Sequence, residues 1–377
     1  MCEEAAKPVP ITPTRMRLVI GAKDTLSPVQ GTPNRSHPVF FRGAVALACL
    51  CLAAAACSSP DSNTDTASPM YSNPVFGHDA PDPSIIRADD GDFYIYTTQS
   101  IYSAGVLNLP ILRSSDLVHW KLAGQVFHDI PRWAVGGPGG DMWAPHGFVY
   151  HGKYYVYYAA REYGTGFMAI GVATSDDPAG PFKDLGKPLR KWERKNYVAI
   201  DPFVFRAKDG HLYLYWGSNS DPLRAQRLTS DGLHLLGKPK VVLASKPSDN
   251  GGLIEGAWIL PHGPYYYLMY SQGDCCSDNP NYQVAVARSK SPLGPFTRDP
   301  NNPILKGDSK FTATGHNATI KDDAGRDWMV YHARVGGQDL TRDRDIMIDP
   351  IEWVGGWPVI KGGVPSFGPH PAPVVDH

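Results

Sequence analysis

Three acidic residues precede aromatic segments of the chain at one shared distance. Asp82, Asp201 and Glu255 lie 12 residues before positions 94, 213 and 267, the second residue of each segment. Trp143 stands 12 residues before position 155, and His316 stands 13 residues before position 329. Two carboxyl groups can break a glycosidic bond when one protonates the leaving oxygen and the other activates water or attacks carbon. Three acids in one narrow space repel each other, so we expect at least one raised pKa.

Each of these residues also has an ordinary structural explanation. Asp82 and Asp201 precede prolines and could start turns. Glu255 precedes a glycine and could be a solvated loop acid, and a lone histidine is most often structural. Their shared place in a repeat favours a common function instead. Metal-dependent hydrolysis would need more histidines or a tight ligand cluster, and the sequence contains no G-x-S-x-G turn for serine catalysis.

The elements that would position these residues form a fivefold repeat. Five short aromatic segments have their second residues at 94, 155, 213, 267 and 329, so the intervals are 61, 58, 54 and 62 residues. A period near sixty, with about four short strands per unit, is typical of a β-propeller. A two-sheet sandwich would not explain the spacing. The sequence therefore predicts an all-β, five-bladed β-propeller, with aromatic strands at 93–97, 154–158, 212–216, 266–270 and 328–332.

In a propeller the strand before each aromatic strand is the innermost and lines the axial channel. Equivalent positions on five such strands would form a ring at one end of the channel. We expect Asp82, Asp201 and Glu255 to meet there, with Trp143 and His316 completing the ring. The flat face of Trp143 would suit a sugar ring.

The first seventy residues differ in character from the predicted propeller. An apolar run at 43–56 follows Arg35 and Arg42 and is shorter than the roughly 20 residues of a membrane-spanning helix. These are the marks of a secretory signal. Cys57 resembles the lipidated cysteine of bacterial lipoproteins. The alternatives to a lipoprotein signal are an ordinary cleaved signal and an uncleaved anchor. We expect an extension with signal at 1–57, a flexible linker at 58–72, the propeller at 73–362 and a Pro-rich tail at 363–377.

Composition excludes several classes of protein. Lys and Arg total 36 against 37 Asp and Glu, so the net charge of −1 argues against a nucleic-acid partner. The hydrophobic fraction of 42% and the charged fraction of 19% are those of a globular protein. Of six cysteines, only Cys275 and Cys276 would remain in the mature domain. They could form a vicinal disulfide in an oxidising compartment or stay as two free thiols.

Six motifs in order resemble those of glycoside hydrolase family 43, whose members include five-bladed arabinanases, arabinofuranosidases and xylosidases. The resemblance spans the whole predicted propeller. The motifs are Ala-Pro-Asp-Pro-Ser-Ile at 80–85, Met-Trp-Ala-Pro at 142–145, Ala-Ile-Asp-Pro at 199–202, Glu-Gly-Ala-Trp at 255–258, Gly-His-Asn-Ala at 315–318 and Arg-Asp-Ile-Met-Ile-Asp-Pro at 344–350.

The resemblance implies a catalytic role for each acid. The family inverts configuration, so Asp82 would be the general base that deprotonates water and Glu255 the general acid. Asp201 would be the third acid, which raises the pKa of Glu255 and orients it. Inversion requires roughly 6.5–9.5 Å between the Asp82 and Glu255 carboxyl groups, whereas a retaining fructan hydrolase would show about 5–5.5 Å.

The resemblance also suggests ligands. His316 resembles a residue beside an axial hydrated cation, often calcium, and Arg344 resembles a channel arginine that contacts substrate or an acid. A structural ion pair is the alternative for Arg344. No organic cofactor is expected.

The loop at 271–276 resembles that of arabinan endo-1,5-α-L-arabinanases. We therefore expect an exported hydrolase of α-L-arabinofuranosyl linkages in plant-type, arabinan-type polysaccharide, attached to a membrane through a lipid at Cys57. An exo-acting α-L-arabinofuranosidase or β-xylosidase, or a non-catalytic carbohydrate-binding propeller, remains an alternative.

Overall fold

The computed structural model describes residues 69–103, 105–135, 141–191, 198–217, 221–336 and 343–376. The predicted extension at 1–57, with its signal and Cys57, lies outside the described residues, as does the linker up to position 68. Within the described ranges, no helix is long and apolar enough to cross a membrane.

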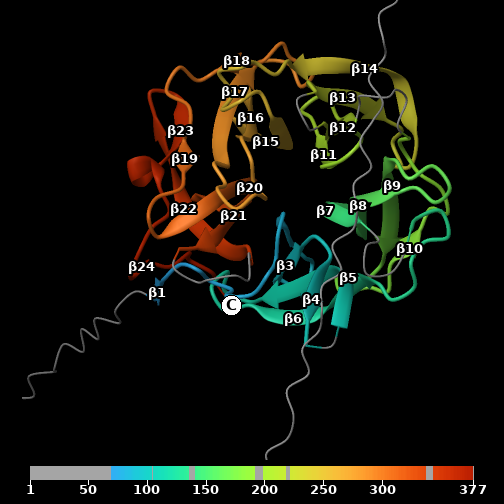
Figure 1. Cartoon of the computed structure of the whole chain (residues 1–377), viewed down its shortest axis with the longest axis horizontal. Helices are drawn as coiled ribbons and strands as arrows, with labels where there is room; N and C mark the ends of the chain where they lie inside the picture. The colour runs from blue at the N-terminus through green and yellow to red at the C-terminus, as the bar shows by residue number, and fades with distance from the viewer. Residues whose placement is uncertain are drawn as a thin grey trace, which may run out of the picture. The chain divides into compact units, whose positions relative to one another are not determined.

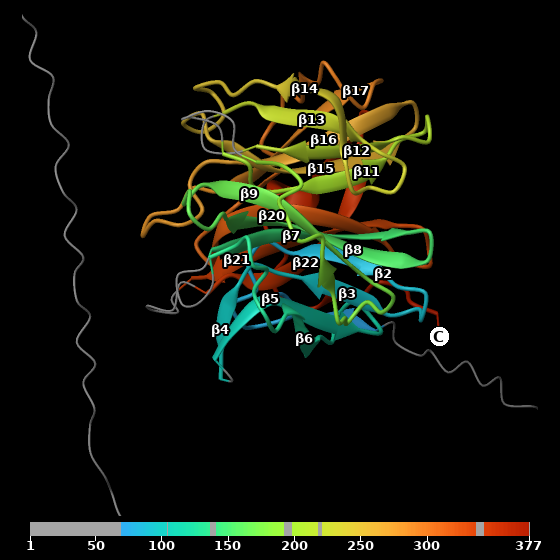
Figure 2. The ribbon, with the colours of Figure 1, turned by 90° about the vertical axis from the view of Figure 1, so that its right-hand side faces the viewer.

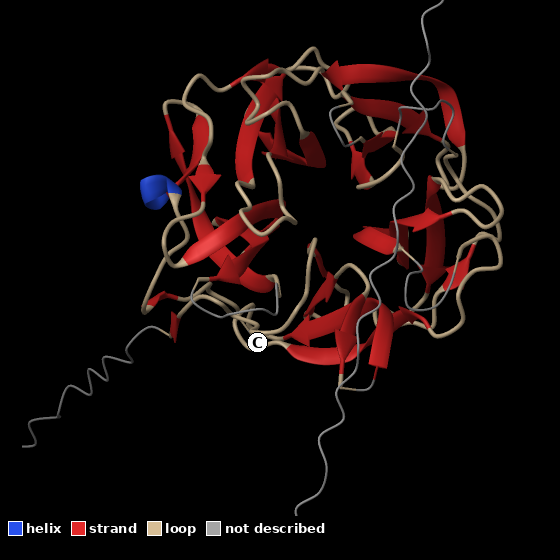
Figure 3. Cartoon of the chain, viewed as in Figure 1, coloured by secondary structure: helices blue, strands red, loops and turns tan. Residues whose placement is uncertain are grey.

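Five antiparallel sheets surround a common axis, and each is built from consecutive strands (Figure 1). This confirms the predicted all-β, five-bladed propeller, whose strands dominate the view in Figure 3. Blade 1 contains β2 (Ser84–Arg87), β3 (Phe93–Tyr96), β4 (Ser100–Tyr102), β5 (Gly105–Ser114) and β6 (Lys121–Phe127); blade 2 contains β7 (Met142–Tyr150), β8 (Lys153–Arg161), β9 (Met168–Ser175) and β10 (Lys183–Asp184).

The other three blades follow in chain order. Blade 3 contains β11 (Phe203–Arg206), β12 (Leu212–Trp216), β13 (Leu223–Leu228) and β14 (Leu235–Leu243); blade 4 contains β15 (Ile254–His262), β16 (Tyr265–Gln272), β17 (Gln283–Ser289), β18 (Thr297–Arg298) and β19 (Leu305–Lys306); blade 5 contains β20 (Phe311–Lys321), β21 (Asp327–Val335), β22 (Asp345–Val354) and β23 (Trp357–Ile360), followed by the 3-10 turn η1 (Lys361–Gly363).

The predicted aromatic strands are β3, β8, β12, β16 and β21, the second strand of each blade. Their side chains alternate between the two neighbouring blades, as the pleat of a strand requires. Tyr154, Val156 and Tyr158 pack toward blade 1, whereas Tyr155 and Tyr157 pack toward blade 3. Each of the five junctions between blades holds such an apolar cluster. The core is therefore divided among the junctions, and the side view in Figure 2 shows the sheets stacked against one another.

Tyrosine hydroxyls tie some of the blades together at these junctions. Tyr96 donates to the carbonyl of Pro178 (2.8 Å), and Tyr157 donates to the carbonyl of Gly232 (3.0 Å). Tyr215 donates in the same way to the carbonyl of Pro292. In each case a buried ring from the second strand of one blade reaches an outer turn of the following blade, so its hydroxyl is satisfied without exposing the ring.

The ring closes where the N-terminal segment lies beside the first half of β22. The backbone of Val75 and Phe76 hydrogen-bonds to Ile346 (2.9 and 3.0 Å), and the side chain of Asn73 bonds both backbone groups of Ile348 (2.8 and 2.9 Å). β23 pairs only with residues 351–354 of β22. The N-terminal segment thus occupies the place of an outer strand in blade 5, and we call residues 73–76 with β22 the closing seam.

The predicted linker and tail meet just outside this seam. β1 (Met70–Tyr71) pairs with β24 (His370–Pro371). Tyr71 is buried and packs edge-on against Trp328, with ring centroids 5.7 Å apart. The last residues of the predicted flexible linker are therefore ordered by an aromatic side chain that has a buried partner.

Candidate active site

Each blade has a residue with a left-handed backbone at an equivalent position, just before its innermost strand or within it. The φ values are 56° at Asp82, 44° at Ala144, 53° at Asp201, 59° at Gly256 and 50° at His316. Non-glycine residues adopt this conformation at an energetic cost, and such residues cluster at functional sites. This recurring residue defines the true equivalence between blades. In blades 2 and 4 the residues predicted for the ring, Trp143 and Glu255, come directly before the left-handed residue and do not occupy its position. The predicted ring was therefore wrong by one residue in these two blades.

The left-handed conformation turns backbone N–H groups toward the neighbouring blade. Ala144 N donates to the Thr98 hydroxyl (2.7 Å), and His316 N donates to the Ser271 hydroxyl (2.7 Å). Asp82 N donates to His332 Nδ1 (3.0 Å) across the closing junction. Side chains from one blade thus hold the site residues of the next, which makes the ring of acids a property of the assembled propeller.

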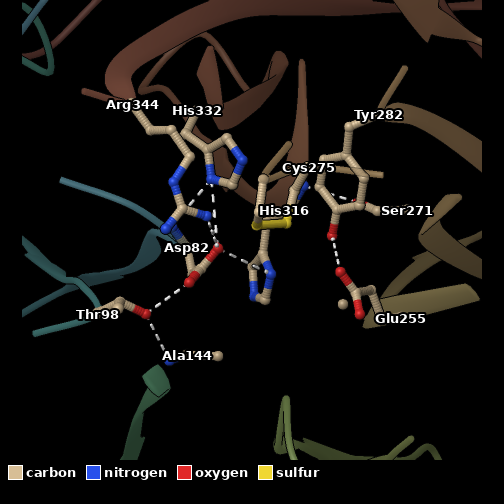
Figure 4. A network of polar contacts seen from close by, with 12 residues as sticks. Asp82, Thr98, Ala144, Glu255, Ser271, Cys275, Tyr282, His316, His332 and Arg344 are labelled. Carbon is tan, nitrogen blue, oxygen red and sulfur yellow. Dashed lines mark hydrogen bonds and ion pairs between the residues drawn. A yellow bond between two sulfur atoms is a disulfide. The ribbon is translucent and has the colours of Figure 1, made fainter. Parts of the chain in front are cut away.

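Asp82 lies among groups that favour its ionised form (Figure 4). Thr98 donates to Oδ2 (2.5 Å) and Arg344 Nη1 donates to Oδ1 (3.2 Å). Nδ1 of His316 and Nδ1 of His332 each lie 3.4 Å from Oδ1. Burial alone would raise the pKa of Asp82, but the charge of Arg344, together with the Thr98 hydrogen bond, holds it well below its usual value. The carboxylate is therefore ready to accept a proton.

The two histidines are themselves neutral. Burial, opposed by the negative charge of Asp82, lowers the pKa of His316, and burial holds the pKa of His332 well below its usual value. His332 Nδ1 accepts the N–H of Asp82, so the ring proton of His332 sits on Nε2.

Asp201 and Glu255 form the second part of the site. The Asp201 carboxylate accepts the N–H of Gly256 at Oδ2 (3.0 Å), and Glu255 Oε1 accepts the hydroxyl of Tyr282 (2.8 Å). Burial, then the charge of Glu255 and then that of Asp82, raises the pKa of Asp201 well above its usual value. This confirms the expectation that crowding raises the pKa of at least one acid. Because the repulsion is mutual, each of these two carboxyl groups disfavours ionisation of the other.

One pocket brings together all six residues predicted for catalysis, substrate binding and the cation. Its volume of about 330 Å³ lies at the small end of the range for ligand sites. Cys275 and Cys276, which also line it, are joined by a disulfide, so of the two alternatives the structure has the vicinal disulfide. The lining residues are Asp82, Thr98, Trp143, Ile200, Asp201, Glu255, Cys275, Cys276, His316 and Arg344.

Sequence reasoning missed four residues that support the site: Thr98, Ser271, Tyr282 and His332. Thr98 and Ser271 each stand four positions after the second residue of an aromatic segment, at 94 and 267, so the repeat that located the acids could have located them too. Tyr282 had no such signal, because it follows the irregular connection between β16 and β17.

The predicted cation near His316 was tested against the donors around it. A cavity of about 10 Å³, room for one water-sized particle, is lined by His316, Asn317 and Ser84 among others. Asn317 Oδ1 is buried there and has no hydrogen-bond partner within the described residues. Calcium takes six to eight oxygen ligands, and the described residues contain no cluster of three His, Cys, Asp or Glu side chains that could hold a metal. These residues alone do not form a calcium cage, so a cation at this position stays a prediction.

The sequence was compared with known families. The family model described as "Glycosyl hydrolases family 43" matches residues 71–358, which covers all five blades except the last two residues of β23. The chain belongs to this family. It is therefore a glycoside hydrolase, and the resemblance seen in its six motifs is confirmed.

Relatives in family 43 include enzymes with different named activities. The chain is 31% identical over 285 residues to the extracellular endo-α-(1→5)-L-arabinanase 1 of Bacillus subtilis (strain 168), covering 74% of this chain and 86% of that protein. It is 29% identical over 310 residues to the extracellular exo-α-(1→5)-L-arabinofuranosidase ArbA of Cellvibrio japonicus (strain Ueda107), covering 75% and 86%. The crystal structure of a thermostable family-43 glycoside hydrolase superposes with a TM-score of 0.71 at 28% identity, covering 81% of this chain and all of that one.

Proposed function

We propose that this family 43 protein is an exported, inverting hydrolase that cleaves α-L-arabinofuranosyl linkages in arabinan-type polysaccharide. The observation that carries the proposal is the arrangement of three carboxyl groups around one pocket. Asp82 accepts hydrogen bonds from Arg344 and Thr98, which favour its ionised form, whereas burial and the charge of Glu255 raise the pKa of Asp201. An inverting hydrolase needs a base and an acid at the same time. The names of the arabinan-cleaving relatives support the choice of sugar.

In this mechanism Asp82 removes a proton from a water molecule as the water oxygen attacks the anomeric carbon. The bond from that carbon to the leaving oxygen breaks, and Glu255 gives its proton to the leaving oxygen. Asp201 repels the negative charge that Glu255 would gain, which favours Glu255 as the proton donor. Arg344 holds the Asp82 carboxylate through Oδ1, and its guanidinium lines the pocket in which the substrate hydroxyls would lie.

Trp143 would bind the sugar face at the pocket wall. Its indole and the Cys275–Cys276 disulfide line the pocket together with the acids. Apolar surfaces of this kind pack against the C–H faces of a furanose, while Arg344 and the carboxylates bind its hydroxyls.

An exo-acting α-L-arabinofuranosidase or β-xylosidase is the second candidate. It is favoured by the relative from Cellvibrio japonicus, which is named as an exo enzyme. The two actions differ in their products from debranched arabinan: an endo enzyme lowers the viscosity rapidly and releases oligosaccharides, whereas an exo enzyme releases only monomer or one short product.

The test of the proposed acid is the substitution Glu255→Gln. Removing a general acid costs about 10²–10⁴-fold in rate, so we expect arabinan hydrolysis to fall by that factor while arabinan binding is kept. Glu352→Gln is the matched control, because Glu352 is exposed on β22 and should leave hydrolysis unchanged. Anomer-resolved NMR of the first product reports inversion. Unchanged hydrolysis by Glu255→Gln, or a product of retained configuration, contradicts the mechanism.

Attachment to a membrane through a lipid on Cys57, and a cation near His316, are further parts of the proposal. Fractionation of cells that express Cys57→Ala tests the anchor, since the enzyme should then leave the membrane fraction.

Dialysis against a chelator, followed by thermal unfolding with and without added calcium, tests the cation.

A further inference from the structure

We infer that Tyr282 is a positioning residue for Glu255: it fixes the carboxyl orientation and directs the transferable proton to Oε2. The inference rests on the proposed function, because it assigns a task to a residue beside the proposed general acid. Tyr282 stands directly before β17 and donates its hydroxyl to Glu255 Oε1 (2.8 Å) (Figure 4).

The ring of Tyr282 is held on several sides. It is 2% exposed and lies parallel to the imidazole of His332, with centroids 5.8 Å apart and an interplanar angle of 10°. Its backbone carbonyl accepts the hydroxyl of Thr314 (3.3 Å). Blade 5 therefore presses the ring against blade 4, and the hydroxyl has little freedom to leave Glu255.

Blade 5 is built to admit this ring. A Cβ atom added at Gly315 would lie 2.1 Å from Cδ1 of Tyr282 and 2.3 Å from Cε1, far inside van der Waals contact. Gly315 precedes the left-handed residue His316, so the missing side chain makes room for Tyr282 within the ring of site residues.

The direction of the hydrogen bond determines where the acid carries its proton. Burial, followed by the negative charges of Glu255, Asp201 and Asp82, raises the pKa of Tyr282 well above its usual value, whereas the Ser271 hydroxyl opposes this shift. The phenol is therefore a donor throughout the working pH range. In a carboxylic acid the carbonyl oxygen is a better acceptor than the hydroxyl oxygen, so a protonated Glu255 that keeps this hydrogen bond on Oε1 carries its proton preferentially on Oε2.

The Tyr282 hydroxyl and the Asp201 carboxylate have opposite effects on the pKa of Glu255. A hydrogen bond to a carboxylate favours its ionised form, whereas a nearby negative charge disfavours it. The titratable and charged groups that face this part of the site are Asp201 from blade 3, Asp82 from blade 1, and Arg344, His316 and His332 from blade 5. Both histidines are neutral, and Arg344 is paired with Asp82. Loss of the Tyr282 hydroxyl therefore leaves Asp201 unopposed and moves the basic limb of the pH–rate profile to higher pH.

The experiment compares Tyr282→Phe with wild type on two substrates. Arabinan has a poor leaving group and needs a well-placed acid, whereas an aryl arabinofuranoside with an acidic phenol needs little protonation. Misplacing a catalytic group by about 1 Å can cost roughly 10²-fold. We therefore expect about a 10²-fold loss of kcat on arabinan, a loss under about threefold on the aryl glycoside, and a basic limb displaced upward.

Two further variants make the result decisive. Tyr157→Phe removes a buried hydroxyl that bonds Gly232, away from the pocket, and should change neither the leaving-group dependence nor the pH profile. Gly315→Ala keeps the Tyr282 hydroxyl but displaces the ring, so it should reproduce the leaving-group dependence even if Tyr282→Phe does not fold. Equal losses on both substrates, or an unmoved basic limb, overturn the role of Tyr282. Wild type that leaves arabinan intact would instead contradict the proposed function.

Discussion

Asp82 and Asp201 are the same residue type at equivalent left-handed positions, yet their pKa values move in opposite directions. Asp82 faces Arg344 and accepts a hydrogen bond from the Thr98 hydroxyl, and both contacts favour the ionised form of Asp82. Asp201 is buried near the charge of Glu255, and both the burial and this charge disfavour the ionised form of Asp201. The position in the repeat places the carboxyl group, and the neighbouring side chains decide what it can do.

The pH profile should report the influence of Arg344 on the base. In Arg344→Met the guanidinium charge is lost, so the pKa of Asp82 rises. Because the base must be ionised to act, the acidic limb of kcat/KM should move to higher pH by about one pH unit or more. Arg326→Met, which removes an arginine paired with Asp322 away from the pocket, serves as the control. If the acidic limb does not move in Arg344→Met, Arg344 does not control the pKa of Asp82.

The six residues predicted from the sequence do meet in one pocket, because a repeat reveals the phase of each residue. Their hydrogen-bond partners were less accessible to prediction. Tyr282 and His332 reach the acids from strands 27 and 250 positions away in the sequence. Only the folded ring brings such residues together.

At the scale of strands, the aromatic segments predicted the blades because each must pack on both sides. The alternation of Tyr155 and Tyr157 with Val156 and Tyr158 fills two junctions from one strand. The one-residue error in blades 2 and 4 has a physical cause. A left-handed residue interrupts the strand register, as the shift between Trp143 and His146 and that between Glu255 and Trp258 show. Counting residues along the chain cannot detect such a bulge.

The tyrosine hydroxyls that join blades should contribute to stability. Tyr157→Phe removes the donor to the Gly232 carbonyl in a buried junction. We expect a loss of about 1–3 kcal/mol in the free energy of unfolding, because the carbonyl remains buried without its partner. Tyr163→Phe is the control, since Tyr163 is 74% exposed. Denaturant titration of both variants measures the difference, and equal midpoints would show that the hydroxyl contributes nothing.

For the molecule as a whole, the closing seam decides whether five blades form a ring. The segment at 73–76 carries no aromatic repeat, so the sequence offered no sign that it would complete blade 5. The stretch at 58–72 was predicted to be flexible from its small polar residues, yet Met70 and Tyr71 pair with the tail. Such local composition does not show that a partner strand arrives from the opposite end of the chain.

Asn73 is the residue on which the seam should depend most. Its side chain bonds both the N–H and the carbonyl of Ile348 and also the hydroxyl of Ser366 (3.0 Å). Asn73→Ala leaves the N–H and the carbonyl of Ile348 without this partner, at about 1–3 kcal/mol for each. We expect a clear fall in the thermal midpoint, measured by calorimetry. Asn301→Ala is the control, because the Asn301 amide bonds its near neighbour Asp299. An equal fall of the thermal midpoint in both variants would contradict a special contribution of the closing seam to stability.

The pairing of β1 with β24 has one more consequence. Met70 lies opposite Pro371, so the two ends of the described domain are neighbours in space. A short peptide could join them, and new termini could be opened in a turn between two other blades, as circular permutation requires. The contacts that now bridge distant parts of the sequence would become local ones, and another junction would take over the task of holding the circle shut.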